Sequence, residues 1–246
     1  MAKPYHHGDL REGLINAAVI RVREQGPESL TVRGLAAALD VSPSAAYHHF
    51  PDKTSIHHEV SQCGIDLLEA QMVTALAEVD ADPAAASRTP AAHSATRFAR
   101  LGRAYVEFAL AEPNLFAHTF GTHCGVDPDE HPMSGAYQLL TAALDDLVAT
   151  GVLDPALRPG LEVPMWSMVH GFAALAVAGH LDPTHAGLCL QATLRLVGAP
   201  EEVIAAEPLP AGALVSASWA IPGQLGPGSP PEQPARRRGG RTSWPE

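Results

Sequence analysis

Residues 31–53 read TVRGLAAALDVSPSAAYHHFPDK, and their capping and apolar residues predict two short helices joined by a tight turn. The first helix is indicated by apolar residues that recur on one helical face: Val32, Leu35, Ala36 and Leu39. Thr31 is a favourable N-cap for this helix. Asp40 and Val41 then form the turn.

The second short helix begins with residues suited to a helix start. Ser42 is a good N-cap, and Pro43 fits the first helical position because the amide there needs no intrahelical partner. This helix ends near Phe50, and Asp52 caps a longer helix expected from Lys53 to about Val79. Two short helices and such a turn predict a helix-turn-helix, in which the second helix enters the DNA major groove and the first braces against phosphate.

Outward-facing side chains of this segment are candidates for DNA contacts. Ser44, Tyr47 and His48 would offer donors, acceptors and an apolar ring to base edges, while a small core holds the angle between the helices. Lys53 stands where free amides and the helix dipole already favour a phosphate. An ordinary helical hairpin within a core is the alternative, although it explains poorly why polar and aromatic side chains stand exposed beside a short capped helix. The predicted core of the motif comprises Val32, Leu35, Ala36, Leu39, Val41 and Phe50.

The charge of the chain limits how it could bind DNA. A formal net charge of -11 argues against a protein that coats nucleic acid or anionic membrane with its whole surface. Residues 1–60 hold six Lys/Arg against seven Asp/Glu, so the N-terminal region is not basic either. DNA binding would therefore depend on a few donors at a local face, with the histidines adding charge at lower pH or against phosphate.

Composition favours an all-helical protein. Hydrophobic residues make up 46% of the chain but aromatics only 5%, and strand-forming residues are scarce. Three cysteines are too few for a disulfide framework, which suggests a reducing cytoplasm. The sequence has no run of about 18 apolar residues and no signal peptide, so we expect neither a membrane span nor secretion.

The remaining segments suggest a second helical region and a tail. Helical spacing marks residues 10–25, 94–111, 113–120, 134–150, 160–180 and 184–197, with a small-residue linker at 80–93. From Glu207 the chain is rich in Pro and Gly, and we expect disorder. The basic cluster there is a solvated feature or a weak attraction for DNA; it comprises Arg236, Arg237, Arg238 and Arg241. The predicted domains are 8–68 (helix-turn-helix), 80–198 (regulatory and dimerising body) and 207–246 (tail).

Aromatic residues of the helical body are candidates for a ligand cavity. Trp166 and His170 share one helix face, where an indole would supply area and an imidazole a polar handle. The alternative is a core tryptophan stacked on a hydrogen-bonded histidine, with Gly171 allowing close helix contact. An aromatic stripe could likewise be plain core. The full candidate set is Phe98, Tyr105, Phe108, Phe116, Phe120, Tyr137, Trp166 and His170.

No catalytic or metal-binding pattern stands out. The sequence lacks a nucleophile elbow, a phosphate loop and a zinc-protease motif, so we do not expect an enzyme or a cofactor. One polar cluster mixes hard and soft ligand types without metal-site spacing, which favours a polar loop over a metal site. It comprises His118, His123, Cys124, Asp127, Asp129, Glu130 and His131.

Residues 5–60 resemble the DNA-binding domain of the TetR family, including the pattern Tyr-x-His-Phe-x-x-Lys, and the opening Tyr5 to Arg11 resembles one subgroup. The resemblance assigns base contacts to Pro43, Ser44, Tyr47 and His48. It assigns phosphate contacts to Thr31, His49 and Lys53. We also expect Arg33 to contact DNA. Ala46 stands where the subgroup often has proline, and His48 where it often has arginine. Because arginine is the commonest reader of guanine, the operator sequence does not follow.

The helical body resembles a TetR-family C-terminal domain with a Trp-His-Gly signature, here within Trp166 to Gly171. Tyr105 to Phe116 resembles the middle of the same domain. This resemblance, over residues 5–198, implies a homodimer whose last two helices pair with those of the partner, a small-molecule effector and a near-palindromic operator. The expected function is a ligand-responsive repressor. The alternative is a helical small-molecule-binding protein or enzyme whose N-terminal hairpin is only structural.

Overall fold

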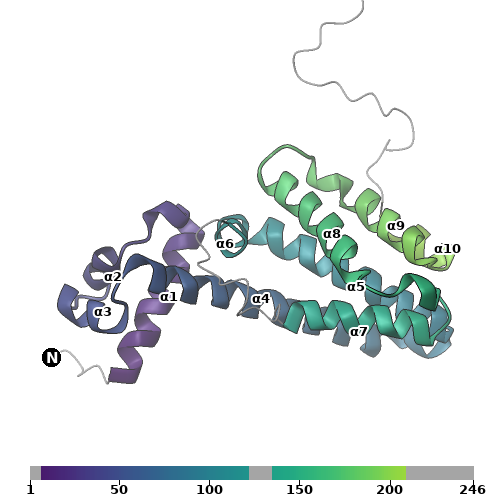
Figure 1. Cartoon of the computed structure of the whole chain (residues 1–246), viewed down its shortest axis with the longest axis horizontal. Coiled ribbons are helices and arrows are strands. Elements are labelled where there is room, and N and C mark those ends of the chain that lie inside the picture. Colours follow the sequence, from purple (N-terminus) through teal and green to yellow (C-terminus); the bar gives the residue numbers. More distant parts are fainter. Residues whose placement is uncertain (1–6, 122–134, 209–246) are drawn as a thin grey trace, which may run out of the picture. The chain divides into compact units, whose positions relative to one another are not determined.

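A computed structural model of the chain describes residues 7–121 and 135–208. Within these ranges the elements are α-helices and short 3-10 turns, with no strand, which confirms the expected all-α fold (Figure 1). The α-helices are α1 His7–Gln25, α2 Val32–Ala38, α3 Pro43–His49, α4 Lys53–Ala81, α5 Pro90–Ala111, α6 Pro113–Thr119, α7 Gly135–Ala149, α8 Glu162–Val177, α9 Ala186–Val197 and α10 Glu201–Ala206. The 3-10 turns are η1 Pro27–Ser29, η2 Pro83–Ser87, η3 Pro155–Leu157 and η4 Pro183–His185.

The helix starts expected around the turn segment are confirmed by their caps. Each capping oxygen accepts a hydrogen bond from the backbone N–H three residues later, at 3.1 Å for Thr31, 3.1 Å for Ser42 and 2.7 Å for Asp52. Asp40 takes a positive φ of 54°, which Asp tolerates better than most residues. It follows Leu39, the C-cap of α2, and turns the chain toward α3.

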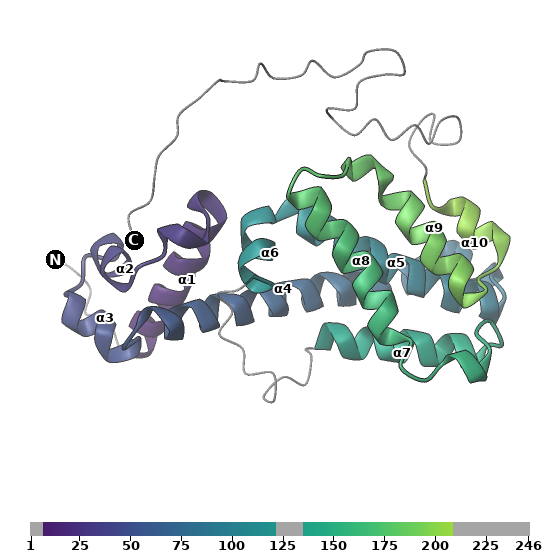
Figure 2. The same cartoon turned by 45° about the horizontal axis from the view of Figure 1, so that its top comes forward.

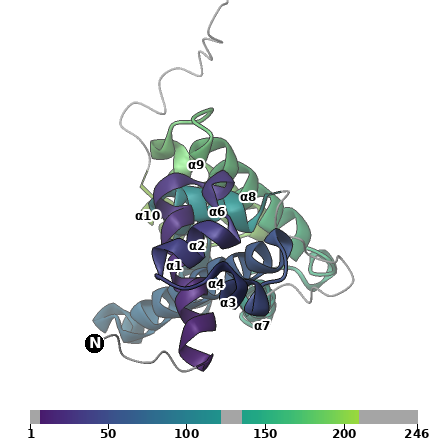
Figure 3. The same ribbon diagram turned by 90° about the vertical axis from the view of Figure 1, so that its left-hand side faces the viewer.

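The N-terminal helices close around a small apolar core, and Figure 3 shows α1, α2 and α3 gathered at that end. Of the six expected core residues, Val32, Leu35, Ala36 and Phe50 are buried, while Leu39 and Val41 are half-buried against them. The Arg11 guanidinium lies 5.5 Å from the centroid of the Phe50 ring and pairs with Glu59 at 2.7 Å. Arg11 therefore ties α1 to the end of α3 and the start of α4.

Helix α5 is the centre of the C-terminal body (Figure 2). It contacts α4, α6, α7, α8, α9 and α10. Helix α10 has no counterpart among the expected helices, and it extends the ordered body to the point where the sequence predicted a tail. Glu207, expected in that tail, is buried: it pairs with Arg103, and its carbonyl accepts from Gln191 Nε2 at 3.0 Å. Residues 209–246 lie outside the described part.

The segment predicted as a linker at 80–93 is instead a compact corner between α4 and α5. Helix α4 continues to Ala81, η2 follows, and α5 already begins at Pro90 with Thr89 as its N-cap. Small residues suggested a linker, but alanines are also good helix formers. The corner is therefore structured over most of its length.

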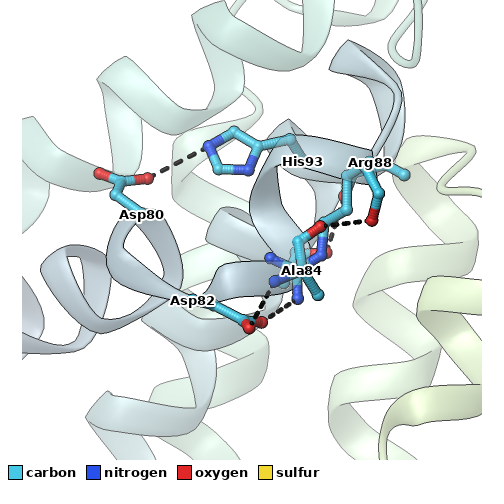
Figure 4. Close-up of polar contacts among 8 residues, drawn as sticks. Asp80, Asp82, Ala84, Arg88 and His93 are labelled. Atoms are coloured by element: carbon cyan, nitrogen blue, oxygen red, sulfur yellow. Dashed lines mark hydrogen bonds and ion pairs between the residues drawn. The ribbon is translucent and has the colours of Figure 1, made fainter.

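Side-chain ion pairs hold this corner (Figure 4). Asp82 accepts a hydrogen bond from the Ala84 amide at 2.9 Å and pairs with Arg88. Asp80 at the end of α4 reaches His93 on α5, with 3.1 Å between Oδ1 and Nε2. The turn is thus fixed by polar contacts rather than by an apolar core.

Candidate DNA-binding surface and internal cavity

The outward face of α3 carries the side chains expected to read bases. Pro43, Ser44, Tyr47 and His48 are exposed, and Tyr47 presents 39% of its surface. Ala46 is fully buried on the opposite face. One face of this short helix therefore holds α3 against the core, while the other is left open to a partner.

Exposed cations lie on the two helices that precede and follow α3 in the chain. Arg33 on α2 and Lys53 at the start of α4 are exposed, and neither has an ion-pair partner among residues 7–121 and 135–208. Thr31 is exposed and already accepts the capping hydrogen bond, so its hydroxyl proton is available to a phosphate. His49 is half-buried, and its ring meets that of His48 edge-on with 5.6 Å between centroids.

Arg21 is a further cation of this surface that the sequence did not single out. A Cβ built on Gly34 would collide with the Arg21 guanidinium and lie 2.8 Å from Thr31 Oγ1. The guanidinium therefore lies at the N-terminal end of α2, beside Thr31. Nothing in the sequence marked it, because its place depends on how α1 crosses α2.

A cavity lies in the helical body. Together with its opening to solvent it contains about 430 Å³ of space not occupied by protein atoms. Three of the eight candidate ligand residues line it, namely Phe98, Tyr105 and Trp166. The other lining residues were not anticipated, since apolar residues on helix faces look the same whether they line a cavity or fill a core; they are Met72, Leu101, Gly102, Leu140, Met165, Val169 and Thr193.

Tyr105 and His170 form a polar pair beside this cavity. The Tyr105 hydroxyl and His170 Nδ1 are 2.8 Å apart. Burial raises the pKa of Tyr105 and lowers the pKa of His170, because both charged forms lose hydration. Both side chains are therefore neutral near pH 7. The Trp166 ring meets the Tyr105 ring edge-on, with centroids 5.0 Å apart.

The remaining candidate ligand residues lie around this pair or farther away. The rings of Phe116 and Phe120 approach the His170 ring, with centroid distances of 5.5 and 5.2 Å. Tyr137 lies 6.1 Å from Trp166. Phe108 is buried but does not line the cavity. One aromatic cluster therefore joins the cavity wall on α5 and α8 to α6.

Helix α6 also touches the N-terminal helices. Asn114 Nδ2 donates a hydrogen bond to the carbonyl of Arg23 at 2.9 Å, and Glu112 Oε2 pairs with Arg23 Nε at 2.8 Å. The His118 ring stacks on the His57 ring of α4, with 4.9 Å between centroids. The aromatic cluster at the cavity and the helix-turn-helix domain thus meet on opposite sides of one short helix.

Only His118, of the seven residues in the polar cluster considered for a metal, lies in the described part of the chain. His118 is buried in α6. The other six residues, at 123, 124, 127, 129, 130 and 131, lie outside the described residues. Within residues 7–121 and 135–208, no three potential ligands are placed to hold a metal ion.

Helices α8 and α9 leave apolar side chains exposed. Val163, Leu175, Leu188 and Leu196 present between 41% and 59% of their surfaces. Gly171 on α8 has no other residue within 4 Å of a Cβ built upon it. This combination marks an apolar face on α8 and α9 that no described residue covers at Gly171.

Sequence comparison identifies both parts of the chain. A family model described as "Bacterial regulatory proteins, tetR family" matches residues 14–60, and a model described as "Tetracyclin repressor-like, C-terminal domain" matches residues 98–197. Together the two matches span more than half of the 246 residues. The chain belongs to the TetR family of transcriptional regulators. Its helix-turn-helix accordingly binds DNA, and the alternative of a carrier or enzyme with a purely structural hairpin is not favoured.

Solved structures share the fold of this TetR-family regulator. A protein of unknown function from Rhodococcus sp. RHA1 is 27% identical, with a TM-score of 0.58 over 80% of this chain and 97% of that one. A tetR-family regulatory protein from Rhodococcus RHA1 is 18% identical, with a TM-score of 0.55 over 78% and 98% of the two chains. RolR in complex with resorcinol is 18% identical, with a TM-score of 0.53 over 83% and 96%. No curated protein sequence matches the chain significantly.

The TetR-family regulator shows no membrane span in its described part. None of the helices in residues 7–121 and 135–208 combines the length and apolar character needed to cross a bilayer.

Proposed function

We propose that this regulator is a homodimeric repressor that reads a near-palindromic operator through α3 and releases it when a small molecule fills the helical body. The observation that carries the proposal is the exposed face of α3, flanked by cations that lack ion-pair partners within the described residues. Base contacts fall to Pro43, Ser44, Tyr47 and His48. Phosphate contacts fall to Arg21, Thr31, Arg33, His49 and Lys53. The protein acts by binding rather than by catalysis, in the cytoplasm.

A second copy of the chain supplies the symmetry that such an operator requires. Two recognition helices about 34–36 Å apart read successive major-groove faces of a palindrome. The apolar face of α8 and α9 is suited to pair with the same face of a partner, because a two-fold interface must be self-complementary. Exposed leucines such as Leu175 and Leu196 would then be buried.

The cavity is the proposed effector site, and α6 is the proposed link to DNA. Phe116 on α6 belongs to the aromatic cluster at the cavity wall, while Asn114 on the same helix bonds to Arg23 of α1. A ligand changes DNA binding only through its different affinity for two arrangements of this link. RolR was solved with resorcinol, so a protein of similar fold accommodates a small ligand. We also assign the chain to the subgroup with a Trp-His-Gly signature, on the residues Trp166, His170 and Gly171.

Selection of operators from random duplexes tests the proposal, followed by binding measurements on two variants. Lys53→Ala should weaken binding to selected and random duplexes alike and reduce the slope of log affinity against log salt by about one, since one phosphate contact is lost. Tyr47→Ala should also change the sequence preference, because its ring faces the bases.

Arg97→Ala is the matched control, since it removes a cation from the α4–α5 corner instead. Unchanged binding in both Lys53→Ala and Tyr47→Ala would show that α3 is not the reading helix. Failure to enrich any palindromic site with folded, dimeric protein would contradict the proposed function as a whole.

A further inference from the structure

The wall of the cavity excludes charged ligands. None of the ten described residues that line it carries a charge. Arg103, next in sequence to the lining residue Gly102, is paired with Glu207. An ionised carboxylate or ammonium group would leave water and find no counter-charge, and such a transfer is strongly unfavourable. The lining therefore favours an occupant whose enclosed part is neutral.

The same wall favours a flat ring over an aliphatic one. Phe98, Tyr105 and Trp166 supply aromatic surfaces, and Tyr105 and Trp166 are fixed edge-to-face at 5.0 Å. Met72 and Met165 add thioethers, whose sulfur atoms contact ring edges favourably. Aromatic rings prefer such offset and edge-on neighbours.

Two of the lining residues, Thr193 and Tyr105, carry a hydroxyl group. Thr193 Oγ1 donates its proton to the Leu190 carbonyl at 2.8 Å, so only its lone pairs are left to accept from a ligand. Tyr105 shares its hydroxyl with His170 Nδ1, and depending on the tautomer of that histidine its oxygen offers an acceptor or its proton a donor. A ligand hydroxyl has one proton and two lone pairs. It can donate to Thr193 while accepting from the tyrosine, or, where the tyrosine oxygen is the acceptor, donate to either of the two.

We propose that the cavity binds a neutral single-ring aromatic molecule that carries a hydroxyl group, and that it rejects the carboxylate of the same ring. The proposal deepens the proposed function, because it names the chemical class of the effector. It rests on that proposed function for its regulatory meaning and on the cavity lining and its hydrogen bonds for its chemistry, and it is tested by ligand binding to the full chain without DNA.

Isothermal titration of the full-length protein with four probes of similar size tests each part of the claim. Phenol is the expected ligand, toluene lacks the hydroxyl, cyclohexanol lacks the aromatic ring, and benzoate carries a charge. Phenol should bind several-fold more tightly than toluene and cyclohexanol, and benzoate should show no binding at the same concentrations. Equal or tighter binding of any of the other three, or no binding of phenol, would overturn the proposal.

Conservative variants place the binding in this cavity. Thr193→Val keeps the side-chain shape but removes the acceptor, and Tyr105→Phe removes the phenolic hydroxyl. Each should bring the affinity for phenol closer to that for toluene, which should change little. Thr96→Val is the matched control, since Thr96 also donates to its own helix, at 2.7 Å to the Ala92 carbonyl, but does not line the cavity. An unchanged ratio of phenol to toluene affinity in both cavity variants would overturn the assigned site.

The experiments distinguish an error in the proposed ligand class from an error in the proposed regulatory function. Phenol binding without release of a selected operator would leave the cavity chemistry standing and contradict the ligand-responsive repressor. Operator binding without phenol binding would contradict the ligand class and leave the DNA-binding function standing.

Discussion

At the scale of single residues, His170 is half-buried and its Nδ1 shares a hydrogen bond with the Tyr105 hydroxyl. Both features should be visible in the titration of the His170 ring. Burial lowers its folded-state pKa below the unfolded value of about 6.5. The unfolded chain then binds more protons than the folded one between the two pKa values. The stability that His170 contributes is therefore complete above pH 6.5 and is lost as the pH falls through that value toward the folded pKa.

We expect an NMR titration of the His170 ring to give a pKa below 6.5. We also expect the thermal midpoint to fall less between pH 8 and pH 5 in His170→Gln than in the unaltered protein, because glutamine keeps an acceptor for Tyr105 but does not titrate. His180→Gln, at an exposed position, is the control. A ring pKa at or above 6.5 would contradict the burial argument.

Single residues also show which parts of the candidate sites could be predicted from the sequence. Tyr47 and Lys53 could be proposed for DNA contact because a cap fixes the register of α3 and therefore its outward face. Thr193 and Arg21 could not, since each acquires its place only when two helices distant in sequence pack together. Helical spacing tells which side of a helix is apolar, but not whether that side meets a neighbour or an empty space.

At the scale of elements, α4 and α6 approach so closely at Gly64 of α4 that no room is left for a side chain there. A Cβ built on Gly64 would collide with Thr119 Oγ1 and lie 3.2 Å from Thr119 Cβ. Alanine in a helix is more favourable than glycine by about 1 kcal/mol, whereas overpacking a core costs about 1–3 kcal/mol. We expect Gly64→Ala to be destabilising in denaturant unfolding, because the collision outweighs the gain in helix propensity.

The matched background for this prediction is Thr119→Ala, which removes the colliding hydroxyl. There the cost of Gly64→Ala should shrink by about 1 kcal/mol or more, as expected for residues in contact. An identical effect in both backgrounds would show that the two helices do not approach as described.

Some helix boundaries are determined by the local sequence, and others are not. The starts of α2, α3 and α4 follow from Thr31, Ser42 and Asp52, because a capping side chain bonds within its own turn. The corner at 80–93 was mistaken for a linker, and α10 was not expected. Helix α10 is followed by Glu207, which pairs with Arg103 far earlier in the chain. The corner instead depends on polar side chains of its own, such as Asp82 and Arg88, that meet only once the chain has turned.

At the scale of the whole molecule, the cavity and the DNA-binding helices are joined through a short chain of contacts. Phe116 touches the aromatic cluster, and two residues earlier Asn114 holds the end of α1. Because α1 packs against α2, α3 and α4, a change in α6 reaches the reading helix through a packed core rather than a flexible linker. This arrangement would give the proposed ligand a physical route to the proposed DNA surface.

The largest-scale prediction concerns assembly. Leu175 on α8 and Leu196 on α9 are 45% and 57% exposed, so burying the rest of each would contribute roughly half of the about 1.5–3 kcal/mol expected for a fully exposed leucine. In a two-fold interface each glutamate substitution would bury two charges without partners. We expect Leu175→Glu and Leu196→Glu to convert a dimer to folded monomers in sedimentation equilibrium, and to weaken operator binding because paired half-sites are no longer read together. Leu157→Glu, 58% exposed in η3, should remain dimeric. A monomeric unaltered protein, or glutamate variants that stay dimeric, would place the interface elsewhere.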